Sequence, residues 1–195
     1  MPMPNRLPPI DWPAIFAAGE DYETWRTGGE YPQNQEKMEE FRLRQGFEDE
    51  AKAFLKALSR PVHVIALAED WCPDVVRHVP ILQRMTEVTD QLKLSFIRRD
   101  TDLEVLARFH TNGTESVPKF GFFNEDFVWC GVWGPLPHAC NELIRRGRAA
   151  GDPRGARIRT GALYKADYDR KVVIDELIAC IDVASSEPWN DPEDP

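Results

Sequence analysis

The sequence has few cysteines, and their positions exclude two common roles for them. The 195 residues include four, at positions 72, 130, 140 and 180. They are too sparse for a disulfide scaffold, and none is paired in the C-x-x-C spacing of a zinc site. The sequence also lacks a glycine-rich phosphate loop and a His-Glu-x-x-His motif, so we expect no bound metal and no cofactor. Any sulfur chemistry would depend on one reactive thiol.

Long apolar runs and an excess of basic residues are also missing. Residues 1–9 contain no apolar stretch of signal-peptide length, and nothing elsewhere approaches the ~20 apolar residues of a membrane span. Lys and Arg number 24 against 33 Asp and Glu, for a net charge of −9. Nucleic acids and anionic membranes attract basic surfaces, so we expect neither as the main partner. We expect a soluble cytoplasmic protein.

The chain has enough apolar sequence for a folded core between proline-rich ends. Apolar residues make up 42% of the sequence. Residues 1–60 are interpreted as a helical N-terminal extension, whose helical pattern over 36–58 has a break or kink at Gly46. Residues 185–195 have the composition of a disordered acidic tail.

Between these ends the pattern predicts alternating strands and helices. The nearly continuous apolar run over 62–68 is typical of a strand buried on both faces, and the alternation over 92–96 predicts a second strand. Helices are expected over 73–90, 102–110, 137–147 and 165–184, and a hairpin over 120–123 and 127–133. A parallel βαβ half joined to an antiparallel ββα half gives an α/β sandwich with helices on both faces.

One cysteine has a position that favours reactivity. Cys72 lies where the first strand ends and a helix begins, and Pro73 occupies the first helical turn, where its missing N–H costs nothing. The free first-turn N–H groups and the helix dipole favour the thiolate, which is the nucleophile. An isolated cysteine is more often a small buried apolar residue, but this position favours the functional interpretation.

The segment around Cys72 resembles the thioredoxin superfamily. Thioredoxins have Trp-Cys-Gly-Pro-Cys where this sequence has Trp71-Cys72-Pro73-Asp74, and Pro80 matches the family's helix-kinking proline. The surrounding sequence is similar to a poorly characterised bacterial thioredoxin-like subfamily.

Two further motifs carry the resemblance across residues 61–147. Val117-Pro118 stands where the family has a cis-proline ahead of the hairpin, and Gly134 matches the glycine that ends the hairpin. The resemblance implies a thioredoxin-like βαβαββα sandwich with a four- or five-stranded sheet. The helical N-terminal extension precedes it, and residues 148–184, a basic loop and an additional C-terminal helix, would pack on it.

The resemblance also implies roles for the site residues. Cys72 would attack a disulfide sulfur, Trp71 would cover one side of the site, and Pro118 in cis would leave the backbone of Val117 free to pair with an extended substrate. Pro73, Asp74 and Gly134 would complete the substrate-binding surface. The partner would be a protein disulfide or a low-molecular-weight thiol.

Three departures from the family pattern matter. Val75 replaces the resolving cysteine, and Ala66 replaces the acid that thioredoxins bury beneath the site. The two losses are consistent, because that acid serves the absent thiol. The charge of Asp74 opposes a Cys72 thiolate, while its carboxylate is placed to cap helix N–H groups, so the sequence does not decide the pKa of Cys72.

The other cysteines are interpreted as packing residues. If Gly134 lies beside the site, Cys130 is four strand residues away, roughly 13 Å, which exceeds the ~7 Å reach of a disulfide. Cys140 falls in the following helix and Cys180 among core residues. An external reductant, either a small thiol or a second protein, would have to resolve a mixed disulfide.

Several charged and histidine residues are weaker candidates. His78 follows Cys72 by six residues, about 240° around a helix, so we expect it to face away from the sulfur. Arg98 and Arg99 end a strand near the expected site and are either solvated charges or contacts for an acidic substrate. Residues 145–159 hold six arginines against one acid, which indicates either a surface loop or a site for an anion or an acidic partner.

Three functions can be weighed against these residues. The first is a monothiol oxidoreductase of thioredoxin fold, acting through a mixed disulfide at Cys72. The second is a non-catalytic binding module for a peptide or protein, which the loss of both the second cysteine and the buried acid favours. A glutathione-transferase-like enzyme is disfavoured, because residues 148–195 are too short for an all-helical second domain.

Overall fold

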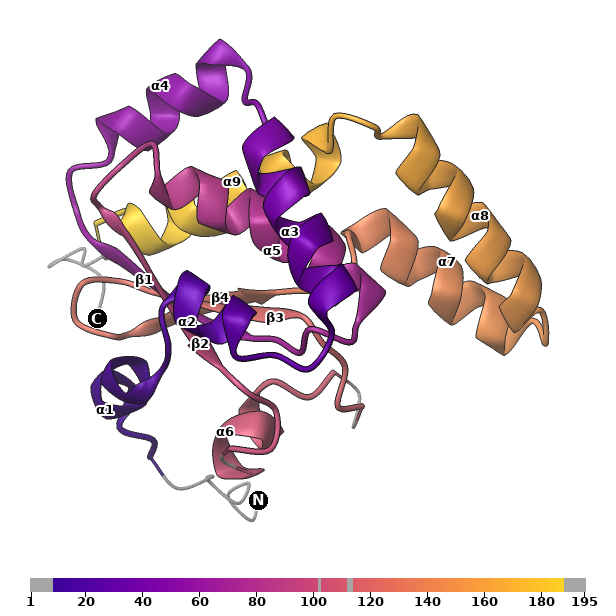
Figure 1. The fold of residues 1–195 in the computed structure, drawn as a ribbon, viewed down its shortest axis with the longest axis horizontal. Coiled ribbons are helices and arrows are strands. Elements are labelled where there is room, and N and C mark those ends of the chain that lie inside the picture. The colour runs from indigo at the N-terminus through magenta and orange to yellow at the C-terminus, as the bar shows by residue number, and fades with distance from the viewer. Residues whose placement is uncertain (1–8, 102, 112–113, 188–195) are drawn as a thin grey trace, which may run out of the picture.

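A computed structural model describes residues 9–101, 103–111 and 114–187, which fold around a four-stranded mixed sheet of order β2-β1-β3-β4 (Figure 1). β1 (Val62–Leu67) pairs in parallel with β2 (Leu92–Ile97) and antiparallel with β3 (Lys119–Phe123). β4 (Trp129–Trp133) forms a hairpin with β3. The sequence prediction of an α/β sandwich with this strand pattern is confirmed.

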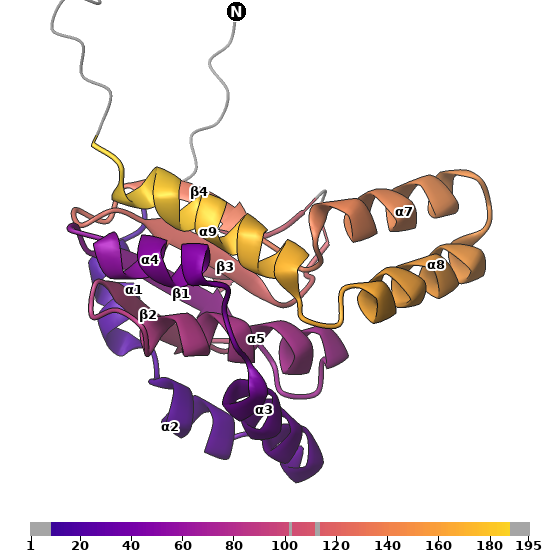
Figure 2. The same cartoon turned by 90° about the horizontal axis from the view of Figure 1, so that it is seen from above.

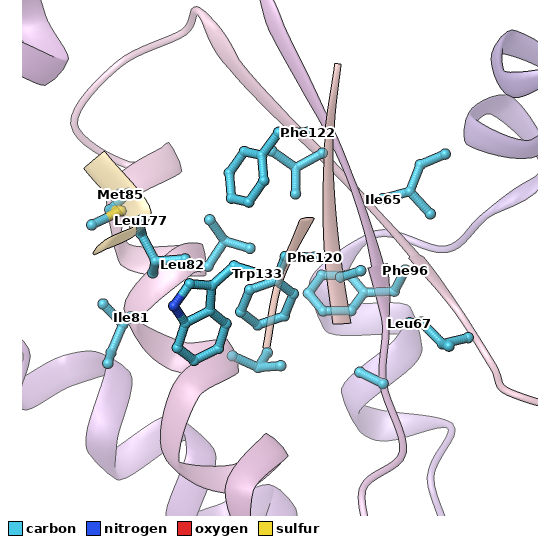
Figure 3. Packing of buried hydrophobic residues seen from close by; sticks show 14 of the residues in the cluster. Ile65, Leu67, Ile81, Leu82, Met85, Phe96, Phe120, Phe122, Trp133 and Leu177 are labelled. Atoms are coloured by element: carbon cyan, nitrogen blue, oxygen red, sulfur yellow. The ribbon is translucent and has the colours of Figure 1, made fainter. Parts of the chain in front are cut away.

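Two helices cover one face of the sheet. α5 (Pro73–Thr86) follows β1, and α9 (Lys171–Ser185) packs mainly against β4. Figure 3 shows Leu82 of α5 and Leu177 of α9 beside the aromatic side chains of the β3–β4 hairpin. Phe120 and Trp133 stack across that hairpin with ring centroids 5.3 Å apart. These contacts hold α5 and α9 against the sheet.

The N-terminal helices pack on the rest of the sheet and on α5. Trp12 of α1 (Trp12–Ala18) contacts the rings of Phe123 and Trp129, while Trp25 of α2 (Tyr22–Thr27) stacks on Phe96 of β2. α3 (Pro32–Arg44) packs against α5, and α4 (Asp49–Ala57) follows after a break that contains Gly46. The expected helical extension is therefore present, with two short helices that the sequence pattern did not predict.

The remaining helices correct one expectation. α6 (Leu103–Arg108) and α7 (His138–Ala149) lie where helices were predicted, but residues 153–166 form α8 (Pro153–Ala166) rather than part of a basic loop. α9 accordingly begins at Lys171 and not near residue 165. The expected acidic tail lies, from residue 188 onward, outside the described residues.

Local capping and small side chains explain the helical hairpin formed by α7 and α8. The Asp152 carboxylate accepts a hydrogen bond from the Gly155 N–H, and Pro153 occupies the first turn of α8. Gly147 lies against Ala156, so the two helices approach closely. Figure 2 shows this hairpin extending away from the sheet. Glycine and arginine content suggested a loop, but capping and helix–helix packing outweigh weak local propensity.

None of the helices within the described residues is both long and apolar enough to cross a membrane.

Candidate functional site

Cys72 lies at the junction of β1 and α5. It is the N-cap residue of α5, Pro73 is the first helical residue, and only 8% of Cys72 is exposed. The Cys72 Sγ lies 3.4 Å from the carbonyl oxygen of Val117 and donates to it. A loop that is 45 residues away in the sequence therefore forms one wall of the cysteine site.

Pro118 and Gly134 complete that wall. The Val117–Pro118 peptide bond is cis, as is Gly134–Pro135. Gly134 has φ +108°, and a Cβ placed on it would overlap the carbonyl oxygen of Pro118. The structure thus brings Cys72, Val117, Pro118 and Gly134 together. Glycine is needed at position 134 both for its backbone conformation and for this close approach.

Trp71 forms the exposed side of the site. It is 43% exposed, and the Arg99 guanidinium lies 5.9 Å from the centre of its ring. The Arg99 backbone N–H donates to Glu69 at 2.7 Å, which fixes this arginine beside the segment that precedes Cys72. Arg98 instead donates to the Trp25 carbonyl and pairs with Glu20, so it connects β2 to the N-terminal helices.

The N-terminal helices hold the segment that carries Trp71 and Cys72. Trp25 donates through Nε1 to the Ala68 carbonyl at 3.2 Å. The buried Asp70 carboxylate accepts from the Tyr31 N–H at 2.8 Å, and Asn34 donates to the Asp70 carbonyl at 2.8 Å. Residues that the sequence alone assigned to an extension therefore position the candidate site.

The pKa of Cys72 is set by opposing effects, and burial is the largest. Burial raises the pKa of the Cys72 thiol, the N–H groups of Val75 and Asp74 lower it, and the Asp74 charge raises it further. The helix N-terminus acts in the expected direction. It is outweighed because a buried thiolate loses its hydration. The net direction is upward, so the thiol form is favoured.

A polar network that the sequence did not reveal connects Asp74 to α8. The Tyr164 hydroxyl donates to Asp74 Oδ1 at 3.0 Å, and its oxygen lies 3.3 Å from Nε2 of His78. Burial raises the pKa of Asp74 and lowers that of His78 to about 3, so the imidazole is neutral near pH 7. The His78 ring also packs edge-on against Trp133.

Lys119 is a second buried group that sequence reasoning missed. Its Nζ donates to the Gly134 carbonyl at 2.8 Å and to the Thr111 hydroxyl. Burial lowers the pKa of Lys119 to about 8. The sequence did contain a signal for this residue, because it is a single lysine directly after the Val-Pro motif in a strand that is otherwise mostly aromatic. The lysine fixes the backbone of Gly134 beside Pro118.

The described residues place no second thiol in the position of a resolving cysteine. Val75 occupies the third position of α5 and is fully buried, as is Ala66 in β1. All four cysteines are free. Cys130 donates to the Val128 carbonyl at 3.2 Å, and burial raises the pKa of both Cys140 and Cys180 to about 11.

The comparison with family models decides to which protein family the chain belongs. A thioredoxin family model matches residues 20–150. The chain belongs to the thioredoxin family. The matched region begins just before α2, so the helices that hold the Trp71–Cys72 segment lie within the family region of this thioredoxin-family protein. No curated protein matches the sequence.

Solved structures support the fold. A protein of unknown function from Pseudomonas aeruginosa aligns with a TM-score of 0.68 at 19% identity, covering 89% of this chain and 98% of that one. An HIV epitope-scaffold aligns with the same TM-score at 18% identity and the same coverage. At these identities the likeness concerns the fold alone.

The contribution of Asp74 to the pKa of Cys72 leads to a prediction. We expect Asp74→Asn to lower the pKa of Cys72, because it removes a negative charge that opposes the thiolate. For each unit by which the pKa falls, alkylation at neutral pH should accelerate about threefold, since the thiolate fraction rises about tenfold while its nucleophilicity falls about threefold. The measurement is the pH profile of iodoacetamide alkylation at Cys72, followed by peptide mass spectrometry.

A matched control for this prediction is Asp90→Asn, which removes an exposed carboxylate beyond the other end of α5. Its profile should coincide with that of the wild type. An unchanged profile in Asp74→Asn would show that the Asp74 charge does not act on the sulfur.

Proposed function

We propose that this protein is a monothiol thiol–disulfide oxidoreductase that acts through a mixed disulfide at Cys72. One observation carries the proposal: the Cys72 sulfur lies at the N-terminus of α5, 3.4 Å from the carbonyl oxygen of the residue before Pro118. This arrangement places a thiol beside backbone that can align an extended substrate. Membership of the thioredoxin family supports a thiol or disulfide as the partner.

The proposed reaction consists of two exchanges. The Cys72 thiolate attacks one sulfur of a substrate disulfide, RS–SR′, forms the mixed disulfide Cys72–S–S–R and releases R′S⁻. An external thiol, R″SH, gives up its proton to solvent, and its sulfur attacks the R sulfur. This step releases the Cys72 thiolate and the disulfide R–S–S–R″. Each step forms one S–S bond and breaks one, so no further electron carrier is needed. A cytoplasmic setting would supply the reducing thiol.

Deprotonation of Cys72 would also free a backbone acceptor for the substrate. In the thiol form, the S–H group donates to the Val117 carbonyl. A thiolate has no proton to donate, and this carbonyl could then accept an N–H from an extended substrate segment. Trp71, 43% exposed, would cover one side of that segment, and Pro73, Asp74, Pro118 and Gly134 would form the rest of its contact surface.

The test uses a peptide whose cysteine carries 5-thio-2-nitrobenzoate as a mixed disulfide. Attack by Cys72 on the peptide sulfur releases the coloured thiolate and leaves the peptide attached to the protein. We expect wild type and Cys130→Ser to react at the same rate and Cys72→Ser to fall to the background rate. Cys130→Ser is the control because Cys130 is partly exposed, whereas Cys72 is buried. Equal rates in Cys72→Ser and wild type would contradict the proposal.

A binding module without turnover is the second candidate, and the burial of Cys72 favours it. With 8% exposure and a raised pKa, the thiol is a weaker nucleophile at neutral pH than a free cysteine. Under reducing conditions, a module would capture the same partners with Cys72→Ser as with the wild type. An oxidoreductase would capture them through Cys72 and lose them when reductant is added.

A further inference from the structure

The α7–α8 hairpin is the strongly basic part of an acidic chain. Residues 138–166 contain seven Lys or Arg and two Asp or Glu side chains, a net charge of +5, whereas the whole chain carries −9. The seven basic side chains are all exposed: Arg145, Arg146, Arg148, Arg154, Arg157, Arg159 and Lys165. Within the described residues, ion pairs of this hairpin join Arg146 to Glu142 and Arg159 to Asp152, which leaves most of the positive charge uncompensated.

The hairpin adds little to the hydrophobic core. Its buried residues are small or polar: Cys140, Gly147, Ala156 and Thr160. Ile158 is 65% exposed and Leu163 is 39% exposed, so apolar side chains lie among the arginines on its surface. Figures 1 and 2 both show the two helices extending side by side away from the sheet. A two-helix extension with this surface is suited to contact another molecule.

The base of the hairpin lies beside the Cys72 site. Tyr164 of α8 donates to Asp74, two residues after Cys72. Tyr164 also lines a cavity of about 280 Å³ whose other lining residues are mostly apolar, among them Pro137, Cys140, Leu163 and Val172, with Asp167 as its one acidic member. At this size the cavity suits one apolar side chain rather than a whole small ligand. Three arginines lie along α8 from Tyr164 toward the N-terminus of the helix. The axial distances from Tyr164 are roughly 8 Å to Arg159, 11 Å to Arg157 and 15 Å to Arg154.

We propose that the α7–α8 hairpin binds an acidic segment of a partner protein, with one apolar side chain of that segment in the cavity at the hairpin base. The segment would run along the arginines and bring the neighbouring residues of the partner to Cys72. This inference extends the proposed function by naming its substrate class, and only the redox consequence rests on that function. The binding itself does not need the Cys72 thiol.

Charge and shape favour an acidic protein segment over nucleic acid. Outside the hairpin the chain has a net charge of −14, the difference between −9 and +5, which repels a phosphate backbone extending past the hairpin. A short acidic segment can end where the positive surface ends. The apolar cavity and the exposed Ile158 and Leu163 also fit a peptide, which carries apolar side chains together with its charges.

The binding test uses two fluorescent peptides without cysteine. One has a leucine followed by about six Glu or Asp residues, which span roughly 20 Å when extended, and the other has Gln and Asn in their place. Fluorescence anisotropy should show that the acidic peptide binds at least about tenfold more tightly, equally to wild type and Cys72→Ser, and more weakly as salt is raised. Equal affinity for the two peptides would overturn the inference.

Matched charge reversals locate the surface. The triple variant Arg148→Glu, Arg154→Glu and Arg157→Glu should weaken binding of the acidic peptide at least about tenfold. The control reverses three exposed lysines on other elements, Lys37, Lys56 and Lys93, and therefore has the same net charge as the hairpin variant. It should bind within about twofold of wild type because its reversed charges lie away from the hairpin. If both triple variants weaken binding equally, the hairpin is not the site. Both triple variants are also made with Gln in place of Glu, and circular dichroism checks that each variant is folded. A loss of binding in a folded variant is then an effect of charge and not of unfolding.

Two further outcomes would contradict the choice of occupant. One is tighter binding of an oligonucleotide than of the acidic peptide at the same salt. The other is self-association in sedimentation that the hairpin reversal removes, which would make a second copy of the chain the occupant. Peptide binding without Cys72-dependent release of nitrothiobenzoate would reject the proposed function and keep this inference. Release of nitrothiobenzoate that depends on Cys72, together with equal binding of the acidic and neutral peptides, would keep the proposed function and reject this inference.

Discussion

The variant Val75→Cys should greatly shorten the lifetime of the mixed disulfide proposed for Cys72. Val75 is the third residue of α5 and its N–H lies close enough to the Cys72 sulfur to lower the pKa of that thiol. Residues one helical turn apart lie within the ~7 Å between Cα atoms that a disulfide allows. The introduced thiol would attack the Cys72 sulfur, displace the partner thiolate and leave an intramolecular disulfide.

The expected effect is large because the second thiol is held in place. An intramolecular attack has a high effective concentration, so we expect the lifetime of the mixed disulfide, without added reductant, to fall at least about a hundredfold. The measurement is intact-mass spectrometry of acid-quenched samples after loading with the nitrothiobenzoate peptide. Replacing a buried valine should lower the free energy of unfolding by about 1 kcal/mol, which can be measured on the reduced variant.

Val79→Cys is the matched control for this experiment. It replaces another fully buried valine of α5, but lies seven residues from Cys72, about 10 Å along the helix axis, and cannot form the bond. Its mixed disulfide should last as long as that of the wild type. Equal lifetimes in Val75→Cys and Val79→Cys would show that the third helical position is out of reach of Cys72.

Gly134→Ala should destabilise the fold by about 2–4 kcal/mol in the free energy of unfolding. At φ +108° an L side chain is strained, and the added Cβ would overlap the carbonyl oxygen of Pro118. This neighbour is backbone, so relief requires movement of the segment that contacts Cys72. Urea unfolding at constant pH measures the change.

Gly131→Ala, in β4 just before Gly134, serves as the comparison. A Cβ at Gly131 would have no atom within 4 Å, and its φ lies outside the positive range. Its free energy of unfolding should stay within about 0.5 kcal/mol of the wild-type value. If Gly134→Ala is as stable as Gly131→Ala, the close approach of Gly134 to Pro118 is not a constraint on the fold.

The strand pattern and the cysteine position were predictable because they depend on local sequence. The apolar run before Cys72 and Pro73 after it place this residue at a strand-to-helix junction, and the structure has this junction. The hairpin over residues 119–133 was equally clear from its aromatic strands. The helix at 153–166 was missed because it contains glycines at 155 and 161 and follows another at 151, which weakens its local signal.

The neighbours of Cys72 were partly predictable and partly not. Val117, Pro118 and Gly134 could be proposed only through the family resemblance, since no local pattern connects them to Cys72. Tyr164 could not be found, because it comes from α8, 90 residues from the Asp74 that it contacts. A hydrogen bond of this kind depends on how the helices pack.

The sequence by itself determined the strand pattern of the sheet, the identity of the single candidate nucleophile and the absence of a resolving cysteine at position 75. The tertiary structure alone decided the direction in which the pKa of Cys72 moves. The helix N-terminus lowers that pKa and is readable from the sequence, whereas burial raises it more. Burial depends on tertiary packing, which brings the Val117 carbonyl to the sulfur from 45 residues away in the sequence.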